Sequence, residues 1–404
     1  MEDKNDLNKI WATSLISILC MLAVTGCWDR REIKDLALVM ASGIDRTENG
    51  QLRGTLQIAV PAAISAGGGG SGTSDGGLGK SFVLVSESGR NIKDMIQRLQ
   101  EKVPRELYFS HRAVFIVGER EAQIGISDIL DQFARDPENR MRNLILVAKG
   151  EKAADVLAVS TVLEKIPGQE IKQIEKQETG TMITMLDFMM ASSSEGMVPV
   201  APAIRTVEGG TNKQGQQKLM LAGTAVFKDL KLVGYLNNQE TRGFLWMTGK
   251  MHKGFITAYI PEGRGSVTLS LTSAKRDVKP IFDKGHIVFE VKLEGKGQIE
   301  ENDTNLNLSD PKSMMIVKKA LDRQVFKYVL RSFKMAQVYD ADVFGFGLEI
   351  DRHSPKRWDK IKDKWDTLFR EAVLHLRVDI KPLRPGIIGP PLQMKEDEVK
   401  KPSS

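Results

Sequence analysis

The chain has 404 residues, a formal net charge of +6 at pH 7 and 41% hydrophobic residues. This is enough apolar sequence to fill the cores of two or three domains, so a disordered protein is excluded. The basic excess is small and spread along the chain, so it predicts a solvated surface and no nucleic acid partner.

The N-terminal segment gives the first indication of function. Its apolar part, residues 11–24, is shorter than the ~20 residues of a membrane-spanning helix and has the length of a signal-peptide core. Gly26 directly precedes Cys27, and Val24 lies three positions before the cysteine, which is the pattern of a bacterial lipobox. We therefore expect residues 1–26 to be removed and Cys27 to carry lipid, because two acyl chains hold a protein stably on a membrane.

Two alternatives for this segment stay open. Its first ten residues carry three acids against two bases, whereas an export signal normally begins with a net positive charge. The segment could therefore stay uncleaved as an anchor, and Cys27 could be an ordinary apolar cysteine. If the leader is removed, Cys20 leaves with it, and no thiol remains for a disulfide, a metal site or a nucleophile.

The first predicted element is a β-hairpin. Two β-prone runs, residues 36–44 and 52–60, flank a turn in which Asn49 and Gly50 accept positive φ.

A Gly/Ser-rich stretch, residues 66–79, follows and predicts a mobile loop. Residues 74–81 resemble a phosphate-binding loop. A strand-like run, residues 82–85, follows where such a loop needs a helix, so we interpret the match as accidental.

Beyond residue 90, helical and strand-like patterns alternate. The expected elements are a helix at 92–103, a strand at 113–117, a helix at 126–133 and a strand at 144–148. This order predicts parallel strands joined by crossovers, with helices covering the sheet.

Residues 153–192 have a helical pattern, and two prolines then favour an extended segment. Four methionines at helical spacing are interpreted as core residues: Met182, Met185, Met189 and Met190. The glycine-rich turn at 209–215 is the predicted boundary between the two halves.

The C-terminal half begins with a strand at 223–228 that turns at Asp229. Three β-rich runs follow, at 254–260, 266–273 and 286–293. The clearest helix of the chain comes next, with Asp310 as N-cap and Pro311 at its first position. Its expected apolar face comprises Met314, Val317, Leu321, Val325 and Tyr328.

The last elements are a helix and a strand. Trp358 and Trp365, with Leu368 and Phe369, predict an amphipathic helix, and residues 373–380 predict a closing strand.

Residue patterns for catalysis are not found in the sequence. The five histidines have no partner at metal-ligand spacing, and Gly-x-Ser-x-Gly does not occur. We therefore expect no enzyme activity, no cofactor and no metal. His111, which opens a buried strand, is the most interesting single residue, although such a histidine is most often hydrogen-bonded at a strand end.

At this point several motifs resemble one family, the Ger(x)C proteins, which are the C subunits of spore germinant receptors. The matching runs are residues 26–33 with 35–37 and 43–45, residues 110–112 leading into 114–119, residues 223–228 with 233–234, and the helix with Trp358 and Trp365.

The resemblance implies a non-catalytic lipoprotein on the outer face of the spore's inner membrane. It would work beside a multi-helix A subunit and a permease-like B subunit in nutrient-triggered germination. The implied fold class is α+β, with three domains of mixed sheets flanked by helices. We assign 1–26 to a signal peptide, 27–210 to two N-terminal domains, 211–385 to a C-terminal domain and 386–404 to a disordered polar tail.

Two other classes are weighed against this one. A lipid-anchored solute-binding protein would share the leader, but it should have two Rossmann-like lobes, whereas the C-terminal half here is β-rich with one long helix. A cell-surface hydrolase would need a nucleophile with partners or a metal set.

Overall fold

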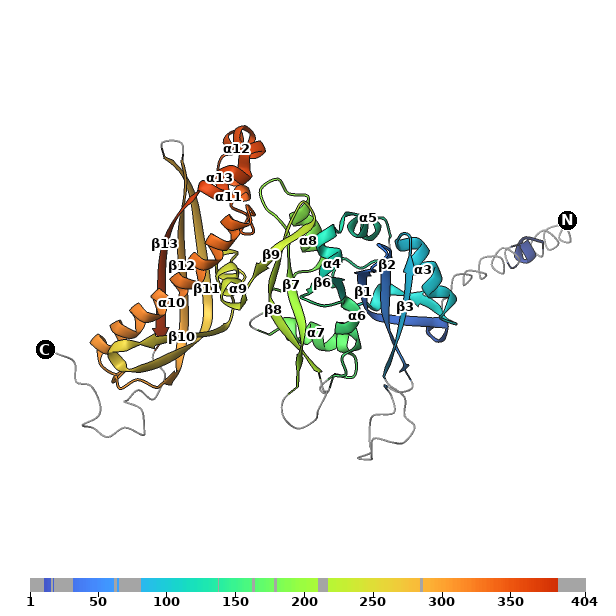
Figure 1. The fold of residues 1–404 in the computed structure, drawn as a ribbon, viewed down its shortest axis with the longest axis horizontal. Helices are drawn as coiled ribbons and strands as arrows, with labels where there is room; N and C mark the ends of the chain where they lie inside the picture. Colours follow the sequence, from blue (N-terminus) through green and yellow to red (C-terminus); the bar gives the residue numbers. More distant parts are fainter. Residues whose placement is uncertain are drawn as a thin grey trace, which may run out of the picture.

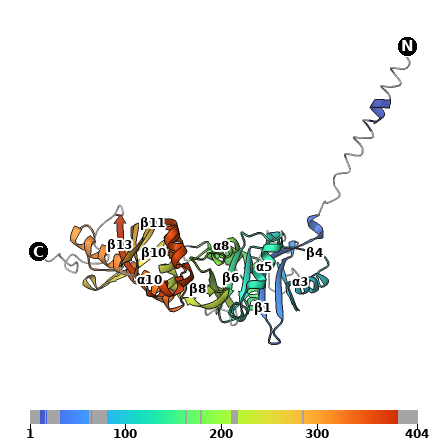
Figure 2. The same cartoon turned by 90° about the horizontal axis from the view of Figure 1, so that it is seen from above.

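The computed structural model describes residues 11–15, 17, 32–61, 64, 81–136, 138–161, 164–177, 180–209, 217–283 and 286–383. Over these ranges the chain forms two mixed β-sheets that lie side by side along the long axis of the molecule (Figures 1 and 2). The predicted α+β class with mixed sheets and flanking helices is confirmed. Cys27, the loop at 66–79 and the tail at 386–404 lie outside the described residues.

The first sheet has nine strands in the order β3-β2-β1-β5-β6-β7-β8-β9, with β4 also paired to β1. The strands are β1 (Leu36–Arg46), β2 (Leu52–Ala59), β3 (Phe82–Gly89), β4 (Glu106–Tyr108), β5 (Val114–Gly118), β6 (Leu144–Ala148), β7 (Val200–Glu208), β8 (Gln217–Lys228) and β9 (Lys231–Leu236). The predicted hairpin is confirmed, since β1 and β2 pair antiparallel and Gly50 has a φ of 76°. The predicted parallel pairing is confirmed for β5 and β6, and β5 also pairs parallel with β1. It is wrong for β3, the first strand of the predicted series, which pairs antiparallel with β2 at the sheet edge.

Helices cover both faces of the nine-stranded sheet. Neighbouring strand residues point to opposite faces, so Phe115 is in the same apolar cluster as residues of α3 (Ile92–Glu101) and α5 (Ser127–Arg135), and Val114 is in a separate cluster. The Phe115 ring centroid lies 4.8 Å from that of Phe133 in α5. That second cluster contains the buried side chains of α6 (Ala153–Ala158) and α7 (Pro167–Glu175). Every residue of β5 and β6 is buried, as expected for parallel strands between two helical layers.

The helical pattern predicted over residues 153–192 is resolved into α6, α7 and α8 (Met185–Ser192). The interpretation of all four methionines as core residues is wrong for two of them. Met185 is buried, but Met182 is 40% exposed and Met190 is 64% exposed. Met182 precedes α8 with a φ of 50°, and Met190 lies on the solvent side of that helix, so helical spacing alone misassigned them.

The boundary predicted between residues 210 and 211 falls between β7 and β8. These two strands pair antiparallel, and β8 and β9 complete the first sheet. The turn predicted at Asp229 is confirmed, since Asp229 and Leu230 both have positive φ. The division of the chain into domains stays a prediction.

The second sheet has four strands in the order β10-β11-β12-β13. They are β10 (Gly254–Ile260), β11 (Gly265–Asp283), β12 (His286–Asn302) and β13 (Val373–Leu383). The long hairpin β11–β12 extends well beyond the two runs predicted for it, because buried and exposed residues continue to alternate along β12. The closing strand β13 pairs parallel with β12.

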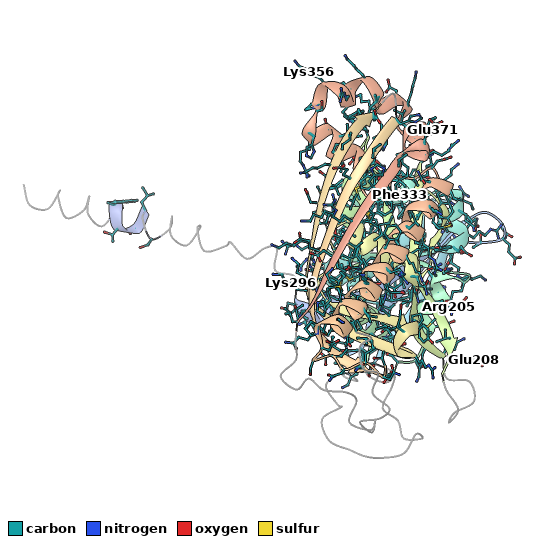
Figure 3. The ribbon with its side chains drawn as sticks, turned by 90° about the vertical axis from the view of Figure 1, so that its left-hand side faces the viewer. Arg205, Glu208, Lys296, Phe333, Lys356 and Glu371 are labelled. Carbon is teal, nitrogen blue, oxygen red and sulfur yellow. The ribbon has the colours of Figure 1, made fainter. Side chains whose placement is uncertain are left out.

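One long helix, α10 (Pro311–Val338), lies across this sheet (Figure 1). Its predicted N-cap is confirmed, since the Asp310 carboxylate accepts a hydrogen bond from the Ser313 N–H at 2.8 Å. Of the five predicted face residues, four are buried and Met314 is partly buried against them. Figure 3, which looks along the long axis, shows Phe333 of α10 in the middle of this half.

The predicted tryptophan helix is interrupted. Residues 355–371 form α12 (Pro355–Ile361), a 3-10 turn and α13 (Trp365–Glu371), preceded by α11 (Phe346–His353). Both indoles are nevertheless buried, with ring centroids 5.4 Å apart. Figure 3 shows these helices, labelled by Lys356 and Glu371, at one end of the long strands.

The two sheets are joined by α9 (Asn238–Met247), a helix that the sequence analysis did not predict. It lies between the sheets in Figure 1, and its Phe244, Leu245 and Trp246 are part of one apolar cluster that contains residues of both halves. Polar contacts strengthen the junction: the Lys228 ammonium donates to the Asp340 carbonyl at 2.9 Å, and the Val198 N–H donates to the Asp342 carbonyl at 2.9 Å.

The carboxylate of Asp342 organises the turn after α10. It accepts hydrogen bonds from the N–H groups of Phe344 at 3.1 Å and Gly347 at 2.8 Å and from the Trp365 indole at 3.2 Å. Burial raises the pKa of Asp342 to about 6, against the opposing effect of these hydrogen bonds.

This raised pKa predicts a pH dependence of stability. Between the ordinary value of 3.8 and about 6, the folded state holds a proton that the unfolded state has released, so the free energy of unfolding falls as pH rises through this window. Asp342→Asn cannot titrate. Its free energy of unfolding should therefore lack the fall across this pH window that Asp342 causes in the wild type, on the order of 3 kcal/mol. Urea unfolding across the window tests this, with exposed Asp359→Asn as control. Equal slopes for wild type and Asp342→Asn would contradict it.

Candidate functional site

The structure contains a cavity of about 240 Å³ between α3 and α5 on one face of the first sheet. Its floor is formed by β1 and β2, and its far end by β5 and the 3-10 turn Phe109–His111. Its apolar lining residues are Ile44, Leu56, Ile92, Met95, Ile96, Leu99, Leu107, Phe109, Phe115, Ile129 and Phe133. Its polar lining residues are Ser42, Lys93, Gln100, Glu106, Arg112, Gln132, Asp136, Glu138 and Asn139.

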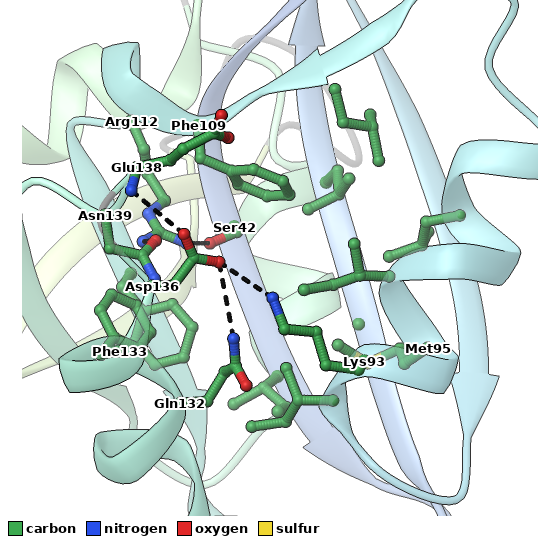
Figure 4. A pocket seen from close by; sticks show the side chains of 18 of the residues that line it. Ser42, Lys93, Met95, Phe109, Arg112, Gln132, Phe133, Asp136, Glu138 and Asn139 are labelled. Atoms are coloured by element: carbon green, nitrogen blue, oxygen red, sulfur yellow. Dashed lines mark hydrogen bonds and ion pairs between the residues drawn. The ribbon is translucent and has the colours of Figure 1, made fainter.

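Arg112 is the buried charge of this cavity (Figure 4). Its Nη1 donates to the Ser42 hydroxyl at 3.1 Å, and its Nη2 donates to the Asn139 side-chain oxygen at 2.7 Å. With the Asn143 amide turned so that its oxygen faces Arg112, Nε also donates at 3.0 Å.

Three aromatic rings surround the same guanidinium. Its central carbon lies 4.5 Å from the ring centroid of Phe133 and 5.5 Å from those of Phe109 and Phe115. Aromatic faces attract a cation, and the attraction grows when the cation is desolvated. The positive charge of Arg112 is therefore stabilised by contacts with neutral oxygens and aromatic ring faces.

Burial lowers the pKa of Arg112 to about 9, and the charge of Asp136 opposes that change. The guanidinium still carries its proton at neutral pH. Within the described chain, none of its hydrogen-bond partners is charged. The cavity thus has a buried cation at one end, and the carboxylates of Asp136 and Glu138 are also in its lining.

A group of polar side chains crosses the mouth of the cavity. The Asp136 carboxylate accepts from the Lys93 ammonium at 3.2 Å and from the Gln132 amide at 3.5 Å, and these contacts link α3 to the residue that follows α5 (Figure 4). Lys93 has 66% of its side chain exposed, so this ion pair sits at the solvent boundary.

The residue singled out from the sequence lies outside this cavity. His111 is exposed, and its ring centroid lies 5.5 Å from that of Tyr108. The functional candidate is its neighbour Arg112, which sequence reasoning missed. The available signal was an arginine between Phe109 and Phe115 at the start of a fully apolar strand, where an unpaired charge would not otherwise be placed.

Among the residues that the structure describes, no group of three histidine, cysteine, aspartate or glutamate side chains is arranged to hold a metal ion. No helix described in the structure is both long enough and apolar enough to span a membrane.

Known proteins resemble this chain along most of its length. Residues 29–206 match the family model of the spore germination protein N-terminal domain, and residues 222–386 match the model described as spore germination B3/GerAC like, C-terminal. Spore germination protein KC of Bacillus subtilis (strain 168) is 29% identical, over 95% of this chain and 98% of that protein. Spore germination protein B3 of the same organism is 26% identical, over 93% of this chain and 98% of that protein.

The crystal structure of the GerBC protein has the same fold. It aligns with a TM-score of 0.55 at 20% sequence identity and covers 88% of this chain and 100% of that chain. The fold therefore defines a multi-domain α+β protein with two mixed sheets. The chain belongs to the family of spore germination proteins that the two family models describe, as its motifs predicted.

The cavity geometry predicts that Asn139 stabilises the fold through Arg112. Asn139→Ala removes a neutral acceptor from a buried cation, and hydrogen bonds to charged groups contribute about 1.5–3 kcal/mol. Urea unfolding should therefore show a loss of that size. Gln132→Ala, which removes only a contact at 3.5 Å, is the control and should cost less. Equal losses for the two variants would contradict the assignment.

Proposed function

We propose that this protein is a non-catalytic, lipid-anchored subunit of a spore germinant receptor that is needed for nutrient-triggered germination. Family membership over both halves of the chain supports this proposal. The named relatives are themselves described as spore germination proteins. The proposed location is the outer face of the spore's inner membrane, and the proposed partners are the A subunit and the permease-like B subunit.

The observation that carries the proposal is the position of β1 relative to Cys27. β1 begins at Leu36, nine positions after the cysteine, and it lies inside the first sheet between β2 and β5. An extended chain spans at most ~3.5 Å per residue, so a lipid on Cys27 would hold the sheet within about 30 Å of the bilayer.

Such a short tether has an energetic consequence. A subunit held near its partners by an anchor meets them at a high effective concentration, so weak polar contacts suffice for assembly. In this proposal the protein stabilises a membrane complex or transmits a signal within it.

The fold gives less support to a solute-binding protein of the usual two-lobed kind. The second sheet is a four-stranded, largely antiparallel one covered by α10, and it differs from a Rossmann-like lobe. We retain the proposed domain division, with residues 27–210 forming two domains and residues 211–385 forming one.

The anchor is tested by Cys27→Ala. This substitution should abolish acyl labelling, leave the leader of residues 1–26 attached and slow nutrient-triggered germination, because neither lipidation nor cleavage can occur without the thiol. Cys20→Ala, which changes the other cysteine of the chain, is the matched control and should label normally. Equal labelling of wild type and Cys27→Ala would refute the anchor.

A further inference from the structure

We propose that the cavity at Arg112 binds a small apolar carboxylate, with its carboxylate on the guanidinium and its body among the apolar side chains. This inference concerns a ligand site in the N-terminal half and is independent of how the protein is anchored.

Arg112 has hydrogen-bonding capacity that its described partners leave unused. A guanidinium has five N–H donors, of which three meet Ser42, Asn139 and Asn143. Two donors remain for a ligand in the described structure. A carboxylate is the matching acceptor, since it is planar and can accept two parallel hydrogen bonds from one arginine.

A buried cation without a contacting anion is costly, and the three aromatic rings offset that cost only in part. The charge of Asp136 already acts on Arg112, and a ligand carboxylate would add the hydrogen-bonded anion that the guanidinium lacks among its described partners. Charge pairing there is stronger than at the surface.

The size and lining of the space also bear on the ligand. About 240 Å³ is smaller than the ~300–1,000 Å³ of sites for drug-sized ligands, which favours a small metabolite. Ile92, Ile96 and Leu99 of α3 face Ile129 and Phe133 of α5 across it, so the body of the ligand must be apolar.

The polar side chains at the mouth of the cavity indicate how a ligand could enter and which of two ligand classes it belongs to. Lys93 is mostly exposed, so its ion pair with Asp136 can open at little cost. A ligand that also carries an ammonium group could replace Lys93 on Asp136, which would favour an apolar α-amino acid. A simple carboxylic acid would use Arg112 alone.

Binding is tested on the full chain reconstituted in lipid nanodiscs, by calorimetry and by the shift in melting temperature. The probes are isocaproate, leucine and isoamylamine, which share one branched apolar body and differ in the carboxylate and the ammonium. We expect saturable binding of isocaproate or leucine and none of isoamylamine. Binding of leucine alone would identify an α-amino acid, and binding of both would show that the carboxylate suffices.

Two variants locate the site. Arg112→Gln should weaken binding about 10- to 100-fold, as expected for loss of a charged hydrogen-bond donor. Because this change could unfold the protein, Ile96→Phe is used as well, since it fills the apolar end and leaves Arg112 in place. Arg135→Ala on the exposed side of α5 is the control and should bind normally.

Three results would overturn the proposal. The first is the absence of binding by both carboxylates to the folded wild-type chain. The second is binding that Ile96→Phe leaves unchanged. The third is binding of isoamylamine as tight as that of isocaproate.

Discussion

The carboxyl end of β1 is the point on which the first half of the molecule depends. The Asp45 carboxylate accepts hydrogen bonds from the first two amides of α6, those of Ala153 at 2.8 Å and Ala154 at 3.1 Å. The next residue, Arg46, forms a bidentate ion pair with Glu121 of α4 (Glu119–Ile124) at 2.6 and 2.9 Å. Adjacent strand residues point to opposite faces, so one strand fixes a helix in each layer. The strand that follows the proposed anchor is therefore also the one that positions the helices.

The same arrangement explains how the two halves are joined. The nine-stranded sheet ends at the β8–β9 hairpin. The ring of Tyr339, at the end of α10, lies against Gly234 of β9. The approach is so close that a Cβ added to Gly234 would lie 2.3 Å from the Tyr339 ring. The Lys228 ammonium pairs with Asp366 at 2.8 Å. These contacts, together with the shared apolar cluster, give the junction a defined packing.

Much of the fold could be predicted because its signals are local. β5 and β6 are apolar at every position since both faces are covered, and α10 carries its own cap at Asp310. The features that were missed depend on tertiary contacts. α9 has a capping box between Asn237 and Glu240 that could have been recognised, but the sequence on either side of it has a β-rich pattern. Arg112 becomes part of a cavity only when α3, α5 and β1 come together, and no single segment of sequence reveals that arrangement.

The central claim is that this protein acts as a tethered member of a membrane complex. It is tested most directly by solubilising spore inner membranes and purifying the complex through a tag on this chain. The account predicts that the A and B subunits co-purify with it and that removing this chain impairs germination. If the chain migrates alone while the A and B subunits remain associated and germination-competent without it, the account is contradicted.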